Sequence, residues 1–231
     1  MKLLEMKNVA YPAGPAPLLR DISLTIEAGD CAVLFGPSGS GKHALLKLAA
    51  GILLPGAGSV AVTGDAEAGA LPSAYVAQDK GLISNLTLLQ NAVLPLVYHG
   101  RLGYREALAQ GRRVMADFAL TDAADMRPAA AGAGRRRIAQ LVRAVLIDPR
   151  LYLFERPFSD IDSAAELMIR RTLRTIKDRR DVGALIATGD PKKYLTWGSR
   201  FIYLEQGRPR FFANAEELAN CRDPQVQAFL T

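Results

Sequence analysis

The fold of this chain is decided by the stretch Val33-Leu34-Phe35-Gly36-Pro37-Ser38-Gly39-Ser40-Gly41-Lys42. It predicts a buried strand, a glycine-rich loop and the start of a helix, and its spacing G-x-x-x-x-G-K is that of a P-loop. The glycines allow such a loop to curl until successive backbone N–H groups face phosphate oxygens, and the helix behind adds the positive end of its dipole. The lysine is placed to reach the outer phosphates of a nucleotide.

The residues after this lysine depart from the motif. A P-loop continues with Ser or Thr, whose hydroxyl holds Mg²⁺, whereas this chain continues with His43 and Ala44. An imidazole is a poor replacement for a hard oxygen ligand of Mg²⁺. The sequence therefore predicts a loop that holds nucleotide phosphates and lacks part of what is needed to cleave them.

The composition is that of one globular domain with a full core. The chain has 231 residues, of which 49% are hydrophobic and 23% charged. No apolar run is long enough to cross a bilayer, and residues 1–7 lack the apolar centre of a signal peptide. We therefore expect a cytoplasmic protein that reaches a membrane only through a partner. Cys31 and Cys221 are expected to be free thiols, since no zinc-type spacing is present.

The net charge of +6 permits nucleic acid or anionic lipid as a neighbour. A solvated basic helix around residues 170–174 explains part of this excess without any such partner. The chain has no aromatic–basic interleaving that would favour nucleic acid. We therefore expect no nucleic-acid partner.

Apolar patterning predicts strands that alternate with helices. The expected strands are 3–9, 22–26, 31–35, 59–62, 74–77, 151–154, 182–187, 201–204 and 208–212, and the expected helices include 42–50, 163–177, 215–219 and 224–230, with a mainly helical stretch near 87–146. We interpret the apolar stripe over 104–118 as core packing. The order favours an α/β fold with a mostly parallel core sheet and an antiparallel β part. We expect one domain over 1–231, with a helical subdomain at about 87–146.

Further landmarks follow the P-loop in a fixed order. Gln78 ends a strand, and residues 143–149 lead into Leu151-Tyr152-Leu153-Phe154-Glu155-Arg156-Pro157-Phe158-Ser159-Asp160-Ile161-Asp162. Over essentially the whole chain this series resembles the ATP-binding subunit of an ABC transporter. Residues 86–96 and 223–230 resemble the Mla/Mce-type phospholipid transporters most. The resemblance implies a P-loop NTPase fold of the ABC type that binds ATP or ADP and docks on an integral membrane permease.

The parts of the family that hold the nucleotide survive in this chain. By resemblance they are Tyr11, Gly36, Ser38, Gly39, Ser40, Gly41, Lys42, His43, Ala44 and Gln78. Tyr11 stands where an aromatic ring stacks on adenine, although a purely structural aromatic is the alternative. Gln78 matches the glutamine that contacts Mg²⁺ or the attacking water and also touches the permease. Asp162 matches the aspartate of the family's D-loop.

The parts that carry catalysis are altered. Glu155 replaces the Walker B aspartate, Arg156 stands at the position of the catalytic glutamate, and Gly189 replaces the switch histidine. A guanidinium stays protonated and has no acceptor, so it cannot orient and deprotonate water. The signature loop, usually Leu-Ser-Gly-Gly-Gln, aligns on Ala131-Gly132-Ala133-Gly134-Arg135 and has lost its serine. The sequence thus assigns no catalytic residue and no metal ligand, and leaves Mg²⁺ open.

Three functions fit this pattern. In the first, a hydrolysis-deficient subunit binds nucleotide weakly, or without Mg²⁺, with Arg156 supplying part of the missing metal charge. In the second, the domain is a scaffold on a permease and its nucleotide site is vestigial. In the third, an atypical ATPase uses Glu155 for metal and Gln78 for water. Each implies a peripheral protein on the inner face of the membrane, paired with itself or with a second ABC subunit.

Overall fold

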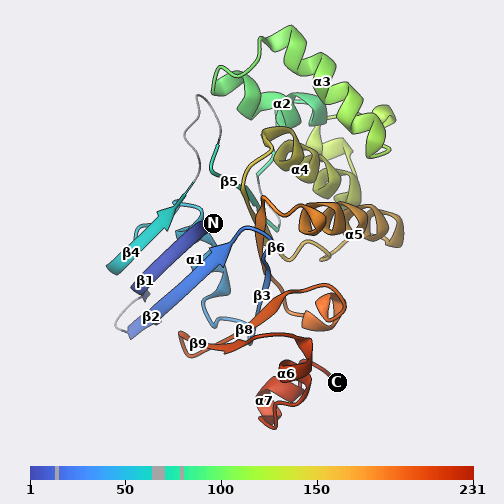
Figure 1. Cartoon of the computed structure of the whole chain (residues 1–231). Coiled ribbons are helices and arrows are strands. Elements are labelled where there is room, and N and C mark those ends of the chain that lie inside the picture. Colours follow the sequence, from blue (N-terminus) through green and yellow to red (C-terminus); the bar gives the residue numbers. More distant parts are fainter. Residues whose placement is uncertain (14–15, 64–70, 79–80) are drawn as a thin grey trace.

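A six-stranded sheet forms the centre of the computed structural model, which describes all residues except 14–15, 64–70 and 79–80 (Figure 1). Its strands, in spatial order, are β5 (Ser73–Val76), β6 (Leu151–Glu155), β7 (Gly183–Ala187), β3 (Cys31–Phe35), β8 (Arg200–Glu205) and β9 (Arg208–Phe212). All neighbours are parallel except β8 and β9, which form a hairpin. The predicted α/β class with a mostly parallel core sheet is confirmed.

A three-stranded antiparallel sheet lies beside the central one (Figure 1). Its order is β2 (Ala16–Glu27), β1 (Lys2–Ala13) and β4 (Ala57–Val62). The expectation of short strands separated by a loop up to Pro17 was wrong, because pairing continues to Pro12↔Pro17 and Ala13↔Ala16. Prolines cannot donate to a ladder, but they are tolerated near its irregular end, where the register shifts between residues 11 and 12.

The helices differ little from their predicted ranges. They are α1 (Lys42–Ala49), α2 (Leu88–Tyr98), α3 (Tyr104–Asp117), α4 (Ala133–Ile147), α5 (Ser163–Asp178), α6 (Ala215–Ala219) and α7 (Pro224–Gln227), with 3-10 turns at Thr121–Ala123, Pro128–Ala130 and Pro191–Tyr194. Thr87 starts α2 with a capping box, since its hydroxyl accepts from the Gln90 N–H while the Gln90 side chain accepts from the Thr87 N–H. Helix α7 ends three residues before the predicted end at 230. The division into one domain with a helical subdomain at 87–146 stays a prediction.

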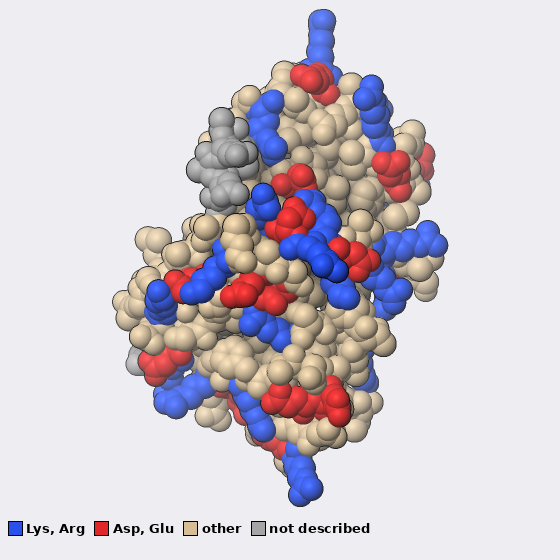
Figure 2. All heavy atoms as spheres, viewed as in Figure 1, with Lys and Arg blue, Asp and Glu red and all other residues tan. Residues whose placement is uncertain are grey.

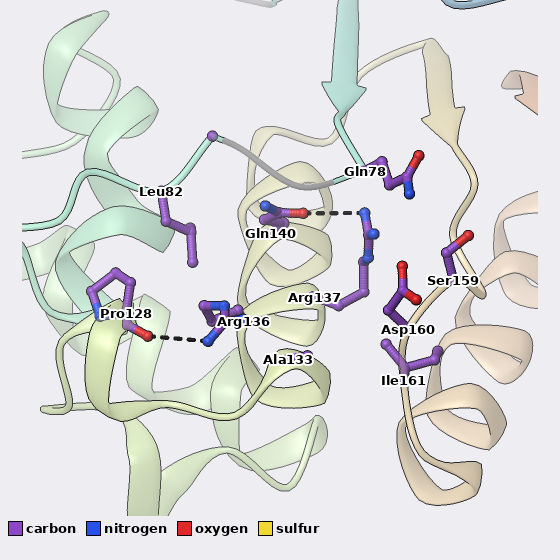
Figure 3. A pocket seen from close by; sticks show the side chains of 11 residues that line it. Gln78, Leu82, Pro128, Ala133, Arg136, Arg137, Gln140, Ser159, Asp160 and Ile161 are labelled. Atoms are coloured by element: carbon purple, nitrogen blue, oxygen red, sulfur yellow. Dashed lines mark hydrogen bonds between the residues drawn. The ribbon is translucent and has the colours of Figure 1, made fainter.

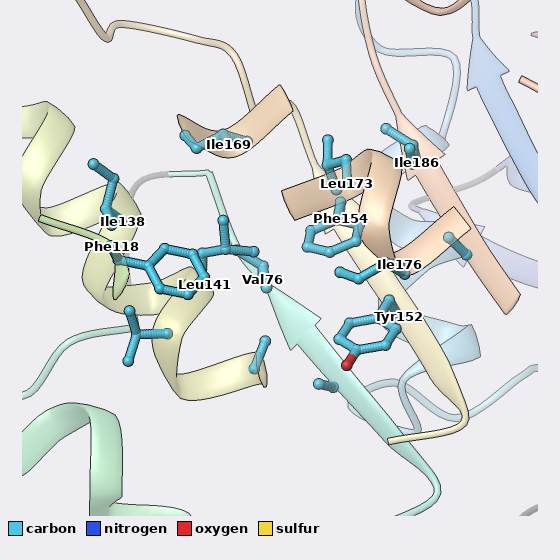
Figure 4. Close-up of a cluster of buried hydrophobic side chains, with 14 of the residues drawn as sticks. Val76, Phe118, Ile138, Leu141, Tyr152, Phe154, Ile169, Leu173, Ile176 and Ile186 are labelled. Atoms are coloured by element: carbon cyan, nitrogen blue, oxygen red, sulfur yellow. The ribbon is translucent and has the colours of Figure 1, made fainter. Parts of the chain in front are cut away.

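Two apolar layers cover the two faces of the central sheet. Alternate residues of β3 point into them: Val33 and Phe35 into one, Ala32 and Leu34 into the other. Burial on both faces explains the unbroken apolar run of this strand. Figure 4 shows the first layer, where Phe154 of β6 and Ile186 of β7 lie beside Leu173 of α5.

The second layer packs α1 against the three-stranded sheet. On α3 the predicted core stripe is confirmed at Ala107, Gly111 and Met115, whereas Tyr104 is exposed. Both cysteines are free and buried, as predicted. In the part of the chain that the structure describes, no helix combines the length and apolarity needed to span a bilayer.

The excess positive charge is distributed among acidic side chains. Figure 2 shows Lys and Arg interspersed with Asp and Glu on one face. Arg179, for example, pairs with both Asp148 and Asp181, and Glu166 pairs with both Arg170 and Lys193. Such exposed pairs contribute little stability individually, but they offset positive charge locally.

Candidate functional site

The predicted glycine-rich loop connects β3 to α1. Gly36, Gly39 and Gly41 have φ values of 144°, 79° and 103°, which are left-handed conformations that other residues rarely adopt. At Gly36 a Cβ atom would lie 2.2 Å from the carbonyl oxygen of Leu204 in β8. The loop therefore needs glycine both for its turns and for its approach to the neighbouring strand.

Gly36→Ala should lower the free energy of unfolding by about 2–4 kcal/mol, because the new methyl group meets a backbone oxygen that cannot move away cheaply. The matched control is Gly29→Ala, at φ 89°, where a Cβ would meet nothing within 4 Å. The control isolates the cost of the left-handed backbone, about 1 kcal/mol. Urea denaturation of both variants measures the difference, and equal losses would show that the Leu204 contact is unimportant.

Lys42, the first residue of α1, lies against the loop itself. Its Nζ donates to the carbonyl oxygens of Gly36 and Pro37, both at 2.7 Å, and to Ser40 Oγ at 3.3 Å. Burial, together with the nearby charge of Arg156, lowers the pKa of Lys42 to about 8. An anion placed in the loop would relieve both effects, since it would supply the ammonium group with a counter-charge.

A cavity of about 480 Å³ opens over this loop. Its described lining consists of Leu18, Gly36, Pro37, Ser38, Gly39, Gly41, Lys42, His43, Ala44, Gln78, Glu155, Arg156, Ala187, Gly189 and Phe229. The structure thus brings together the P-loop, the end of β5 and the ends of β6 and β7. Ser40 lies just beneath and is buried. Leu18 and Phe229 were not predicted as site residues: Leu18 belongs to no motif, and Phe229 lies in the segment 223–230 that was quoted only for its resemblance to lipid transporters.

Tyr11 is not among the described residues that line this cavity. It lies on β1 opposite Leu19, and its half-buried side chain packs against the apolar layer beside α1. The β1–β2 pairing is longer than expected and places Tyr11 inside a ladder instead of in a loop. Both roles of Tyr11, the ring that stacks on adenine and the structural aromatic, stay predictions.

Glu155, at the end of β6, is fully engaged by hydrogen-bond donors. His43 Nδ1 is hydrogen-bonded to its Oε1, the Tyr75 hydroxyl donates to Oε2 at 2.7 Å, and the Gln78 N–H donates to Oε2 at 3.4 Å. Burial alone would raise the pKa of Glu155, but the bonds from Tyr75 and His43 hold it below the ordinary value. This carboxylate is therefore ionised and paired within the protein.

Tyr75 was also missed by sequence reasoning. It lies on β5, and β5 is a parallel neighbour of β6, so its hydroxyl lies beside the carboxylate that follows Phe154. Burial and the hydrogen bond to Glu155 raise the pKa of Tyr75, which keeps it a donor. The strand order that brings the two together cannot be inferred from either segment alone.

These residues do not fit Mg²⁺. The family's hydroxyl ligand is replaced by His43, and that imidazole is itself bonded to the acidic group that would face the metal. Both oxygens of Glu155 already accept hydrogen bonds from the protein. A hard cation that demands oxygen ligands would have to break this pair to bind here.

Arg156 and Gly189 lie side by side at the ends of β6 and β7. The Arg156 Nη1 donates to Gln78 Oε1 at 3.4 Å, and a Cβ at position 189 would lie 3.3 Å from Arg156 Nη2. The side chain of Arg156 therefore occupies space next to a residue that has none. Sequence reasoning treated these substitutions as two separate losses, whereas the structure makes them neighbours.

The signature-like segment is not part of this cavity. Gly132 caps α4, and Arg135 is directed to Asp122 instead of to the P-loop. Ala133 lines a second cavity of about 500 Å³, to which Gln78 also contributes (Figure 3). Asp162 caps α5 by accepting from the Ala165 N–H at 2.8 Å. Its position supports a structural role in the chain.

The fold and the loop define a P-loop nucleotide-binding domain. The family model of the ABC transporter matches residues 19–159. Sulfate/thiosulfate import ATP-binding proteins of Cucumis sativus and Bordetella bronchiseptica are each 30% identical over 213 residues, covering 89% of this chain and 61% and 60% of those proteins. The Fe(3+) ions import ATP-binding protein FbpC of Pseudomonas fluorescens is 30% identical, covering 100% of this chain and 67% of that protein. The chain thus spans about three fifths to two thirds of these relatives.

The chain belongs to the ABC transporter family. Its structure also resembles a dimeric, post-hydrolysis ATP-binding cassette bound to ADP and Pi, with a TM-score of 0.81 and 25% identity over 91% of this chain and 98% of that one. The named relatives are import proteins for sulfate, thiosulfate or Fe(3+). They do not support the expected likeness to Mla/Mce-type lipid transporters.

Proposed function

We propose that this chain is a nucleotide-binding ABC subunit that holds ATP or ADP without Mg²⁺ and does not hydrolyse it. The observation that carries the proposal is the pairing of His43 with Glu155. His43 stands at the position of the hydroxyl that binds the metal, and Glu155 stands at the position of the carboxylate that faces the metal. In this chain the two side chains are hydrogen-bonded to each other. Arg156 extends the same argument, because it stands where a base would have to accept a proton from water.

The residues that would hold the nucleotide are those of the loop. Backbone N–H groups of the loop from Ser38 to Lys42 and the start of α1 suit phosphate oxygens. The Lys42 ammonium group, bound here to loop carbonyls, suits the outer phosphates. The nucleotide would supply a counter-charge for Lys42 and Arg156, and the chain would bind and orient it.

The partners follow from the family. A subunit of this type would dock on an integral membrane permease at the inner face of the membrane and pair with itself or with a second ABC subunit. The signature-like segment 131–135 lies outside the P-loop cavity of its own chain, which supports a pairing that brings it to another subunit. Lipid transport stays a prediction, and the names of the relatives favour an import role.

The test is calorimetric titration with ATP in EDTA across pH 7 to 9. The pKa of Lys42 is lowered to about 8 in the free protein, and bound phosphate would raise it by stabilising the ammonium form. Binding should therefore be strongest below pH 8 and weaken as the pH rises through 8, by up to about tenfold per unit, with uptake of a proton.

Two variants of Lys42 complete this test. Lys42→Ala should weaken ATP binding about 10-fold or more, the range of one charge-assisted hydrogen bond. Lys42→Arg should bind with an affinity that no longer changes between pH 7 and 9, because arginine stays protonated. Binding that is unaffected by Lys42→Ala would contradict the proposed site.

A further inference from the structure

We propose that Arg156, admitted to the cavity by Gly189, binds the outermost phosphate of a metal-free nucleoside triphosphate and makes the site prefer ATP to ADP. The inference rests on the proposed function and adds the group that selects the ligand. It assigns one role to two substitutions that are 33 residues apart in the sequence.

The backbone holds Arg156 in an uncommon conformation. Its φ is 42°, in the left-handed region that non-glycine residues adopt only when the surroundings enforce it. The Arg156 N–H donates to the carbonyl oxygen of Ala187 at 2.8 Å, which ties this residue to the end of β7. The next strand over, β7, thereby fixes the direction in which this side chain leaves the end of β6.

Gly189 provides the space for the guanidinium. A Cβ atom there would lie 3.3 Å from Nη2, tighter than nine in ten real Cβ contacts, so the end of this side chain would have to shift by a few tenths of an ångström, and a longer side chain would compete for the same volume. On the other side, Nη1 donates to Gln78 Oε1 at 3.4 Å. The guanidinium therefore lies on the wall of the cavity, between the side-chain amide of Gln78 and the backbone of Gly189.

The cavity presents this guanidinium together with a second cation. Among its described lining residues, the fixed positive groups are Lys42 and Arg156, and the carboxylate is Glu155. Glu155 is hydrogen-bonded to His43 and to Tyr75, and no hydrogen bond or ion pair between it and either cation is found among the described residues. The effect of Arg156 on the pKa of Lys42 shows that the two cations sense each other. An anion bound between them would relieve their repulsion.

The place of Arg156 in the cavity determines which phosphate group it can bind. The loop backbone suits the inner phosphates at the end of β3, and the outermost phosphate, which Lys42 also reaches, then lies in the cavity lined by Arg156 and Gly189 at the ends of β6 and β7. A planar guanidinium can donate two parallel hydrogen bonds to one phosphate. A diphosphate that fills the loop leaves this group without its ligand, so Arg156 should distinguish ATP from ADP.

The experiment measures ATP and ADP affinities by calorimetry in EDTA for the whole chain. Arg156→Ala should weaken ATP binding about 10-fold or more while ADP binding changes less than about threefold. Arg156→Gly removes the same group at a position whose φ suits glycine, so a folding defect cannot explain its loss. Gly189→Leu should reproduce the loss by displacing the guanidinium, because leucine has no donor of its own for phosphate.

Arg113→Ala is the matched control. Arg113 is exposed on α3, and its replacement removes one positive charge away from the cavity, so both affinities should stay at the wild-type value. Equal losses for ATP and ADP in both Arg156 variants, or no loss for either, would overturn the inference while leaving metal-free binding intact. A wild-type protein that binds neither nucleotide in EDTA would overturn both this inference and the proposed function.

Discussion

Purified wild-type protein should release phosphate from ATP no faster than its Lys42→Ala variant, even with excess Mg²⁺. Phosphoryl transfer to water depends on a metal that neutralises charge, a group that orients the water, and contacts to the transferred phosphate. Each of these requirements is altered in this chain: the metal site by His43, the group that orients water by Arg156, and the contact to the transferred phosphate by Gly189. Loss of a single stabilising group typically costs about 10²–10³ in rate, so the combined loss should put turnover below detection.

A coupled assay for inorganic phosphate at saturating ATP makes this measurement. The Lys42→Ala variant is the proper baseline, because it removes the P-loop cation and reports contaminating ATPases equally. Steady release by the wild type that disappears in Lys42→Ala would establish the atypical ATPase instead. Glu155 and Gln78 would then have to act as that alternative assigns them.

Replacing the His43–Glu155 pair by Ser and Asp should make ATP binding depend on Mg²⁺. The double variant His43→Ser/Glu155→Asp supplies a hydroxyl ligand and a shorter carboxylate that is no longer bonded to an imidazole. We expect Mg²⁺ to strengthen ATP binding about 10-fold or more in this variant, the range of one charge-assisted contact. In the wild-type protein, Mg²⁺ should change the affinity for ATP little.

The single variant His43→Ser separates the contribution of the new hydroxyl ligand from that of the shorter carboxylate. His43→Ser alone leaves Glu155 bonded to Tyr75 and to the Gln78 N–H, so it should gain less than the double variant. Contacting residues of this kind are expected to be non-additive. His99→Ser, which changes a histidine at the end of α2, is the control and should gain nothing. A Mg²⁺ response in that control would exclude the pair as its cause.

The sequence was most informative where one segment determines its own structure. The strand Cys31–Phe35 and the helix from Lys42 match their predicted bounds, because an unbroken apolar run, glycines and a helix start are all local signals. The strand that begins at Leu151 was also predicted, although it ends at Glu155, one residue beyond the predicted end. The paired residues 12–13 and 16–17 were mistaken for a loop, since proline signals turns more often than the ends of ladders.

The site itself depended on contacts that no local pattern contains. His43 and Glu155 are 112 residues apart, and they meet because the first turn of α1 faces the end of β6. Sequence reasoning found both substitutions and treated them as independent. Tyr75 carried no motif at all, and its role follows only from the pairing of β5 with β6.

The most direct test of metal-independent binding is a calorimetric titration of the wild-type protein with ATP, once with Mg²⁺ and once with EDTA. Because His43 is hydrogen-bonded to Glu155, we predict that ATP binds in both conditions. The two affinities should agree within about threefold, a smaller difference than the loss of one charge-assisted contact would cause. Binding that is lost on adding EDTA would contradict the account and would mean that this pair opens to a metal. Absence of binding in both conditions would also contradict it and would leave the domain as a scaffold.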